Sequence, residues 1–313
     1  MNERVQALRE LSVTTQPHID MERAKSETAT YKKYEGQLSV PELRAQVLYD
    51  YFAAKTLYIG EGELIVGEKG DSPHGAPTFP ELCCHTLEDM HVMNDRELIS
   101  FSVKEEDYDY QEKEIIPFWE KRSTRSKILA NMSDQWKDCY AAGIFTEFME
   151  QRGPGHTVGS FKLYEKGFLD YKADIQASID SLDYFHDTEA FEKRNQLRGM
   201  AKACDAIMLL GARYADYARE LAQKETCDTR KAELLQIAAN CDVVPAHKPQ
   251  TFWQAIQMYW FVHLGVTTEL NPWDAYSPGR FDQHLNPFYQ KDVEEGILDD
   301  KKALELLECL WVK

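Results

Sequence analysis

The sequence has 313 residues, of which 43% are apolar, and a formal net charge of −17 at pH 7. This apolar content is sufficient for a substantial buried core, which excludes a disordered chain. A strongly acidic surface repels phosphate backbones and anionic lipid headgroups, so we expect no binding to nucleic acids or membranes. The length fits one large domain or two average ones.

No apolar run is long enough to cross a membrane. The richest, residues 255–266, is too short and is interrupted by Gln257 and His263. The N-terminus is polar and lacks the apolar core of a signal peptide. Seven cysteines without a CxxC pair are typical of free thiols in a reducing compartment, so we expect a cytoplasmic protein.

The first third of the chain combines helical and β-type patterns. Residues 1–35 read as polar helix. Ser39 and Glu42 have the spacing of a capping box and predict the start of the next helix. Residues 56–59 and 64–66 are short β-type runs joined by a Gly-rich turn, which predicts a hairpin.

A long Gly- and Pro-rich loop is expected over residues 67–80. Residues 81–140 then read as helical. We expect breaks near Ser102 and Pro117, and a helix cap at Ser133.

The last third of the chain is mainly helical by its apolar spacing. Residues 197–224 predict the clearest long helix, and residues 252–264 an aromatic helix buried on nearly every side. Residues 270–287 contain three prolines and predict a structured loop. A last helix starts near Asp299, and its apolar pattern continues to Lys313, so we expect the natural chain to extend further.

Two constrained turns carry the candidate binding residues. Within residues 145–159, a Gly-Pro-Gly turn holds His156 at a fixed point beside Phe148, although a surface histidine after a helix end fits the pattern as well. Asp274 follows Trp273, and this pair is able to hold a cationic amine by charge and ring face together. The alternative is an Asp that forms only an Asx-turn.

A metal site is not favoured by the sequence. Cys83, Cys84, His85 and His91 fit no common zinc spacing, and we interpret them as buried thiols and ordinary histidines. His263 is interpreted as a core histidine. Because no GxSxG, HExxH or GxGxxG motif is present, residue types alone indicate only a soluble α/β or mostly helical protein with a small-molecule pocket.

Four stretches together resemble the N-terminal part of the glycyl radical enzymes, the pyruvate formate-lyase-like family. They are GELIVGEKGD (62–71), GAPTFPE (75–81), RGPGHT (152–157) and PGRFDQHLNPFY (278–289). The resemblance extends over essentially the whole chain. Within the family it is strongest to the members that dehydrate trans-4-hydroxy-L-proline.

The resemblance implies an α/β fold, a ten-stranded barrel of two half-barrels wrapped in helices. Residues 1–313 would be its predominantly helical N-terminal portion, truncated at the C-terminal end. The thiyl cysteine and the radical glycine of the family match no residue here, so the resemblance implies no catalytic residue, metal or bound cofactor in this segment. Alone, the segment is expected to be inactive.

For the whole enzyme, the resemblance implies a hydro-lyase of anaerobic metabolism. A radical-SAM activating enzyme would install the glycyl radical, which generates the thiyl group. A hydrogen is then taken from C5 of the proline ring, the C4 hydroxyl leaves as water, and the product is Δ1-pyrroline-5-carboxylate. A homodimer is also implied.

Three residues of this chain match substrate-binding positions of the family. Phe148 would pack against the ring, His156 would bind the hydroxyl or carboxylate, and Asp274 would pair with the ring amine. Diol dehydratases of the family carry a His-Ser pair where this chain has Trp273 and Asp274, and an anionic Asp suits an ammonium better than a diol. The alternatives are another glycyl radical lyase acting on a different amine, diol or sulfonate, and a non-catalytic helical scaffold.

Overall fold

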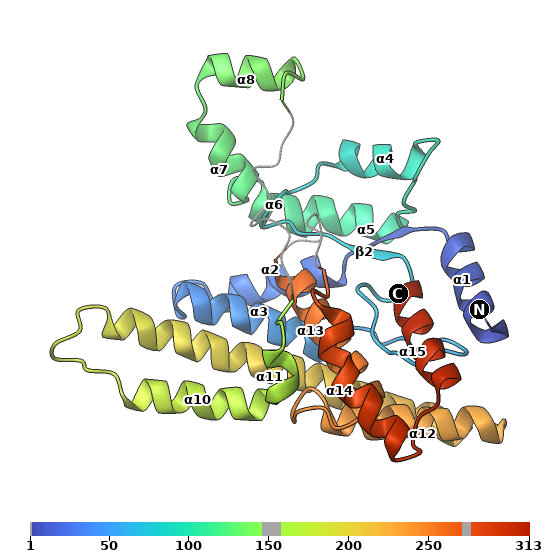
Figure 1. Cartoon of the computed structure of the whole chain (residues 1–313). Helices are drawn as coiled ribbons and strands as arrows, with labels where there is room; N and C mark the ends of the chain where they lie inside the picture. Colours follow the sequence, from blue (N-terminus) through green and yellow to red (C-terminus); the bar gives the residue numbers. More distant parts are fainter. Residues whose placement is uncertain (1, 146–157, 271–276) are drawn as a thin grey trace.

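The structure, a computed structural model, describes residues 2–145, 158–270 and 277–313, and these are mainly helical (Figure 1). Up to residue 145 the elements are α1 (Glu3–Thr14), β1 (His18–Asp20), α2 (Glu22–Tyr34), α3 (Val40–Ala54), β2 (Gly75–Pro77), α4 (Leu87–Asp95), α5 (Glu105–Tyr110), the π-helical turn η1 (Gln111–Ile115), α6 (Ile116–Trp119), α7 (Thr124–Asn131) and α8 (Asp134–Ala141). From residue 158 they are α9 (Lys162–Glu165), α10 (Phe168–Asp180), α11 (Ala190–Lys224), α12 (Asp228–Val243), α13 (Phe252–Glu269), α14 (Phe281–Glu294) and α15 (Asp300–Val312). The two strands pair in parallel.

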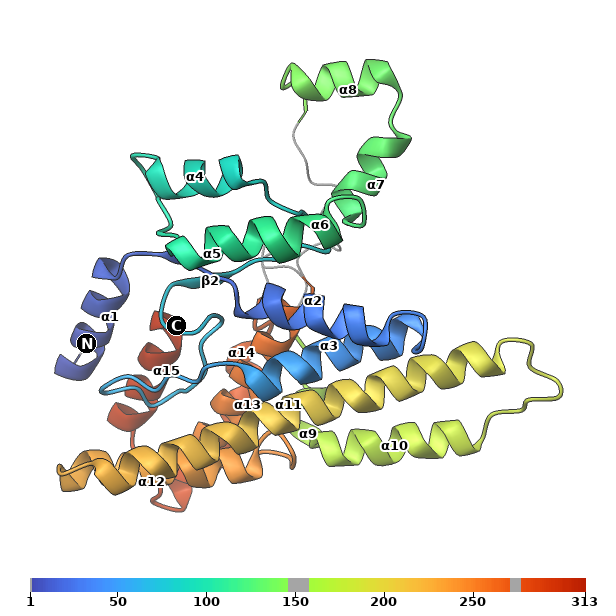
Figure 2. The same ribbon diagram turned by 180° about the vertical axis from the view of Figure 1, so that it is seen from behind.

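The long helix α11 organises one half of the molecule. It packs against α3, α10 and α12, and α3 packs in turn against α2 (Figure 2). Its buried residues recur at three- and four-residue spacing, as a helix with one apolar face requires. The helix predicted for residues 197–224 is therefore confirmed, and it begins earlier, at Ala190.

Helix α13 lies between two hydrophobic clusters, which explains its aromatic composition. Phe261 belongs to the cluster formed with α3, α11 and α12. Phe252 and Ile256 belong to the cluster formed with α1, α14 and α15. The buried helix predicted for residues 252–264 is confirmed and continues to Glu269.

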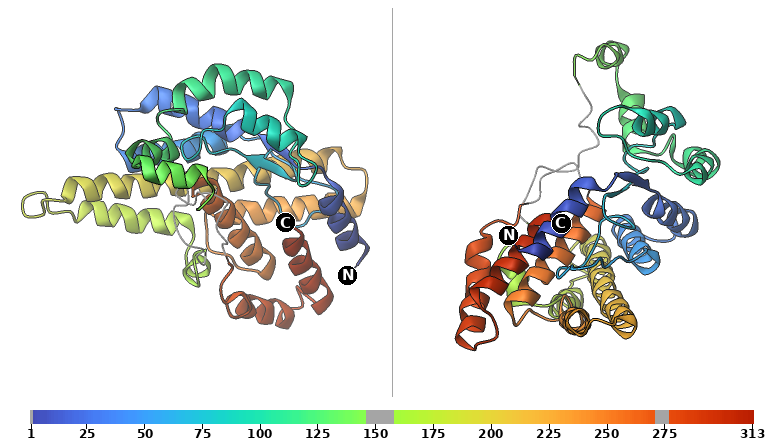
Figure 3. Two further views of the ribbon diagram at one scale, coloured as in Figure 1. Left: turned by 90° about the horizontal axis from the view of Figure 1, so that it is seen from above. Right: turned by 90° about the vertical axis from the view of Figure 1, so that its right-hand side faces the viewer.

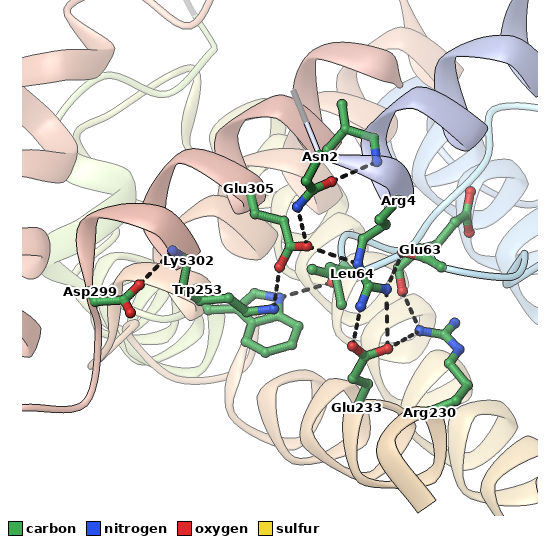
Figure 4. A network of polar contacts seen from close by, with 12 residues as sticks. Asn2, Arg4, Glu63, Leu64, Arg230, Glu233, Trp253, Asp299, Lys302 and Glu305 are labelled. Carbon is green, nitrogen blue, oxygen red and sulfur yellow. Dashed lines mark hydrogen bonds and ion pairs between the residues drawn. The ribbon is translucent and has the colours of Figure 1, made fainter. Parts of the chain in front are cut away.

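The hairpin predicted for residues 56–66 is wrong. Residues 61–62 form a turn and residues 64–65 a bend, and the whole stretch lies outside any strand among the residues that the structure describes. Arg230 of α12 donates from its guanidinium to the main-chain carbonyl of Glu63 at 2.9 Å (Figure 4). It also donates to the carbonyl of Gly60 at 2.9 Å. A side chain therefore takes the place that a second strand would occupy.

Side chains of helix α13 also form hydrogen bonds with the main chain of the same stretch. The indole N–H of Trp253 donates to the carbonyl of Leu64 at 2.9 Å (Figure 4). The Gln257 amide accepts from the Val66 N–H at 2.9 Å and donates to the Val66 carbonyl at 2.8 Å. Buried main-chain groups need such partners, and here side chains of α12 and α13 supply them.

Between residues 102 and 133 the predicted breaks are confirmed only in part. Ser102 lies between helices, in an isolated β-bridge with His18, and Ser133 caps α8 through its hydroxyl. The break near Pro117 is wrong, because α5, η1 and α6 form one continuous helical run. The wider π-helical turn directly before Pro117 gives a residue without an N–H a place in the helix.

The loop predicted for residues 270–287 is wrong in its second half. Helix α14 starts at Phe281 and contains Pro287, because Phe281 and Leu285 are buried against α13 and α15. Residues 271–276 lie outside the described residues. The capping box at Ser39 and the helix start at Asp299 are both confirmed.

Helices α7 and α8 extend away from the main body, as Figure 3 also shows, and none of their residues is buried. No helix among the described residues combines the length and apolar character needed to cross a lipid bilayer. The mainly helical architecture is confirmed. The ten-stranded barrel stays a prediction, since β1 and β2 are the only strands in the part of the chain that the structure describes.

Candidate functional site

The three predicted binding residues, Phe148, His156 and Asp274, lie outside the described residues. The described chain resumes at Val158 after the first segment and at Ser277 after the second. The N–H of Val158 donates to the carbonyl of Ser277 at 3.3 Å, and the Val158 side chain is buried. The chain shortly after His156 and the chain shortly after Asp274 therefore meet.

The C-terminal end of α13 leads directly into residues 271–276. The last carbonyls of a helix lack partners within the helix. Here Arg23 of α2 donates from Nε to the Thr268 carbonyl at 3.0 Å. Arg44 of α3 donates to the Glu269 carbonyl at 3.2 Å and to the Glu269 carboxylate at 2.6 Å. Two guanidinium groups thus cap this helix end and complement its dipole.

Arg23 is 2% exposed and is surrounded by fixed partners. It donates to Glu27 at 2.7 Å and to both carboxylate oxygens of Glu81, at 2.8 and 3.2 Å. The ring of Phe79 covers the guanidinium at 3.9 Å. We call Arg23, Arg44, Glu27, Glu81 and Glu269 the terminal cluster.

The terminal cluster contains three carboxyl groups and two guanidinium groups. Burial, opposed by the charge of Arg23 and reinforced by a hydrogen bond with Glu81, raises the pKa of Glu27 well above its usual range. The raised pKa favours the protonated form of Glu27 over the ionised form. With that proton the cluster is neutral, which reduces the cost of its burial.

His263, Trp260 and Tyr259 lie on α13, in the turns that precede the helix end held by the terminal cluster. The His263 ring stacks on Trp260 at 5.2 Å, and its Nδ1 lies 3.3 Å from the Tyr259 hydroxyl. Burial, aided by the positive charge of Lys69, lowers the pKa of His263 to about 4. The ring is therefore neutral near pH 7, in agreement with its interpretation as a core histidine.

Two hollows lie near this region. A groove of about 590 Å³ between α10, α11 and α13 is lined mainly by apolar side chains, among them Phe168, Ile207 and Val266, although Asp174 and Glu269 also line it. A smaller hollow of about 220 Å³ runs along residues 63–75 and contains Lys69 and Glu68. An apolar groove does not suit a zwitterionic ligand, since it offers little to replace the hydration of the charges.

No group of three or more His, Cys, Asp or Glu side chains able to hold a metal ion occurs among the described residues. Arg125 donates to the Cys83 sulfur at 3.2 Å, and burial raises the pKa of Cys84 to about 12. His91 stacks on Tyr108 at 4.4 Å. The contacts of Cys83, Cys84 and His91 are those of structural side chains.

The sequence did not indicate the terminal cluster. Arg23 and Glu27 have the i, i+4 spacing of an ordinary surface pair, and most such pairs are solvated. Their burial depends on Glu81, which follows a Gly- and Pro-rich loop far along the chain. The one sequence feature that could have drawn attention to the cluster is the GAPTFPE stretch, because it contains both Phe79 and Glu81.

The whole chain, residues 1–313, matches the sequence model of the pyruvate formate lyase-like family, and the chain belongs to this family. It is 60% identical over 311 residues to trans-4-hydroxy-L-proline dehydratase of Clostridioides difficile, covering 99% of this chain and 39% of that protein. It is 35% identical over 321 residues to isethionate sulfite-lyase of Nitratidesulfovibrio vulgaris, covering 99% of this chain and 39% of that protein.

Comparison with solved structures finds the same kinds of enzyme. The crystal structure of hydroxyproline dehydratase from Clostridioides difficile with trans-4-hydroxy-L-proline bound superposes with a TM-score of 0.95 at 59% identity, covering 100% of this chain and 40% of that chain. The glycerol-bound B12-independent glycerol dehydratase from Clostridium butyricum superposes with a TM-score of 0.92 at 27% identity, covering 100% and 39%. The chain thus spans about two fifths of the length of these relatives.

Proposed function

We propose that residues 1–313 are the N-terminal part of a pyruvate formate lyase-like domain in a glycyl radical hydro-lyase. Its reaction is the dehydration of trans-4-hydroxy-L-proline to Δ1-pyrroline-5-carboxylate. The observation that carries the proposal is the 60% identity to the Clostridioides difficile dehydratase, against 35% to an isethionate sulfite-lyase. The TM-score of 0.95 with a dehydratase that holds this substrate supports it.

In this proposal the rest of the enzyme supplies the radical chemistry, which removes a hydrogen atom from C5 of the ring and later returns it. This segment supplies part of the wall that binds the substrate and excludes water. The C4 hydroxyl leaves with a proton as water, and the C5–N double bond forms. A radical-SAM activating enzyme, a homodimer and an anaerobic cytoplasmic setting belong to the same proposal.

The roles proposed for the chain's own residues follow the chemistry of the substrate. Trans-4-hydroxy-L-proline presents a secondary ammonium, a carboxylate, a hydroxyl group and an apolar ring edge. Asp274 would pair with the ammonium, His156 would bind the hydroxyl or the carboxylate, and Phe148 would pack against the ring. The meeting of Val158 and Ser277 supports a shared site for these residues.

The second candidate is a glycyl radical lyase for another small amine, diol or sulfonate. The identity to isethionate sulfite-lyases favours it over unrelated chemistry, and Asp274 argues against an anionic sulfonate by charge. A non-catalytic helical scaffold is the remaining alternative.

The test uses the complete protein, activated anaerobically by its activating enzyme and S-adenosylmethionine. Trans-4-hydroxy-L-proline, isethionate and 1,2-propanediol are supplied separately, and the products are identified by mass spectrometry. We expect turnover of hydroxyproline alone. Turnover of isethionate or propanediol with none of hydroxyproline would establish the second candidate, and a protein that forms no radical would favour the scaffold.

A further inference from the structure

Three lysine side chains lie partly or fully buried around the Gly- and Pro-rich loop, and they differ in their partners. Lys55 of α3 is buried and donates to the main-chain carbonyl of Lys69 at 3.2 Å. Lys313 is buried as well, and it forms an ion pair with Glu63 at 2.5 Å and a second one with Glu68. The third lysine is Lys69 itself, whose side chain is half-buried. The ammonium groups of Lys55 and Lys313 therefore have acceptors.

The ammonium of Lys69 has no such acceptor in the part of the chain that the structure describes. Burial alone lowers the pKa of Lys69 to about 8, since no described neighbour adds a charge or a hydrogen bond that would raise it. Burial also acts to lower the pKa of Lys313, but Glu63 and Glu68 outweigh it and raise that pKa above its usual value. Proteins rarely retain a buried cation unless an acceptor pairs with it, because its desolvation is costly.

Lys69 also belongs to the lining of a hollow. This hollow, of about 220 Å³, runs along the loop, and its other walls come from α1 and α15. Glu63 and Glu68 line it too, but both of their carboxylates are already bound by Lys313. A hollow of this size holds several water molecules, so it has room for a carboxylate side chain or a small acid.

We propose that this hollow is a carboxylate-binding site, in which the Lys69 ammonium is the cation that holds the ligand. A carboxylate supplies both the acceptor oxygens and the negative charge that no described residue offers to Lys69. The main chain of the site is already fixed, because Lys55 and the Tyr51 hydroxyl donate to the Lys69 carbonyl at 3.2 Å each. The ligand is an Asp or Glu side chain from the rest of the complete protein, or a free small carboxylic acid.

Replacing Lys69 by Met distinguishes a paired from an unpaired cation by the direction of the effect. Removal of an unpaired buried charge relieves its desolvation cost, so the loop becomes more stable. Removal of one partner of a buried ion pair leaves the other charge uncompensated, so the loop becomes less stable. The direction of the change therefore reveals a bound carboxylate before that carboxylate is identified.

The experiment uses the complete protein without activation and compares Lys69→Met with Lys301→Met, the same substitution at an exposed lysine of α15. Hydrogen exchange of the amides of residues 66–70 is measured by mass spectrometry, in acetate and in chloride at equal ionic strength. Acetate is the probe for a free acid. Because neither the radical nor the substrate takes part, a failure of the proposed function would leave this result unaffected.

For Lys69→Met we expect exchange at least about 10-fold faster than in the parent protein in both salts, and no change for Lys301→Met. That result would assign the ligand to the protein itself. Slower exchange of the parent protein in acetate than in chloride, absent from Lys69→Met, would support the site with a free acid as its ligand. Exchange of Lys69→Met equal to or slower than that of the parent protein, without an acetate effect that depends on Lys69, would overturn the inference.

Lys69→Gln is the second variant, for the case in which Lys69→Met does not fold. A glutamine retains N–H donors for a carboxylate but loses the charge, so part of the interaction remains. We expect exchange of the same amides about 3-fold faster than in the parent protein in chloride. Exchange no faster than in the parent protein, again without an acetate effect that depends on Lys69, would overturn the inference.

Discussion

The Nε of Arg23 donates a 3.0 Å hydrogen bond to the carbonyl of Thr268, which lies 245 positions further along the chain. Both residues are buried, so no water is available to replace the bond if it is lost. It couples the second helix of the chain to the end of α13. The terminal cluster therefore makes the order of α13 depend on the N-terminal helices.

Glu27→Gln tests the proton assigned to the terminal cluster. Because the pKa of Glu27 is raised in the folded state, the folded protein binds more protons than the unfolded one between about pH 4.5 and the raised pKa. The stabilisation of the folded state that this proton binding provides is present below about pH 4.5, and it is lost as the pH rises through the raised pKa of Glu27. The facing charges are Arg23, Arg44 and Glu81.

We expect Glu27→Gln to reduce the decline in thermal unfolding midpoint between pH 5 and pH 8, because a glutamine is neutral throughout. The midpoint is measured by calorimetry on the complete protein, with the exposed Glu294→Gln as control. A decline as steep as in the parent protein would show that Glu27 is ionised throughout this range.

Gln257→Leu tests whether a side chain replaces a β-strand. The substitution leaves the buried N–H and C=O of Val66 without their partners, at about 1–3 kcal/mol for each group. We expect the Val66 amide to exchange at least 10-fold faster, measured by hydrogen exchange and mass spectrometry. The exposed Gln223→Leu on α11 is the control, and equal exchange in both variants would contradict the pairing.

Gly67→Ala tests the close approach of the main chain at Gly67 to α13. Gly67 has φ +126°, and a Cβ there would lie 2.5 Å from Leu264 Cδ1 and 3.1 Å from Trp260 Nε1. Strain and overpacking together predict a loss of about 2–4 kcal/mol. Gly36→Ala, with φ +78° and open space around it, should cost about 1–2 kcal/mol. Equal losses in urea unfolding would argue against the contact.

Asp292→Ala tests the cap at the start of α13. The variant leaves the buried Phe252 N–H without an acceptor and removes a favourable charge, which predicts a loss of about 2 kcal/mol. Asp282→Ala, exposed in the first turn of the same helix, should cost less than about 1 kcal/mol through its lost interaction with the helix dipole. Thermal unfolding measures the stability of both variants. An Asp292→Ala protein as stable as the Asp282→Ala control would contradict the assignment of Asp292 as the cap of α13.

Local signals in the sequence predicted much of the fold. Capping residues such as Ser39 and Ser133 and the apolar spacing of α11 and α13 depend only on neighbours a few positions away. The stretch 56–66 was predicted wrongly because its partners are side chains of distant helices, Arg230 and Gln257. The periodicity of apolar residues depends on near neighbours in the sequence, so it does not reveal hydrogen-bond partners on distant helices.

The candidate site was predicted by motif resemblance more than by residue chemistry. Phe148, His156 and Asp274 remain predictions, since they lie outside the described residues. Arg23 and Glu27 escaped notice because burial, which turns a surface-type pair into a structural junction, is a tertiary property. No spacing rule in one sequence distinguishes the two situations.

The most direct test of the proposed function is one anaerobic measurement on the complete protein with trans-4-hydroxy-L-proline. Formation of Δ1-pyrroline-5-carboxylate is followed with and without the activating enzyme and S-adenosylmethionine. We expect product only after activation, in step with the glycyl radical signal. A full radical signal without product would contradict the assigned substrate.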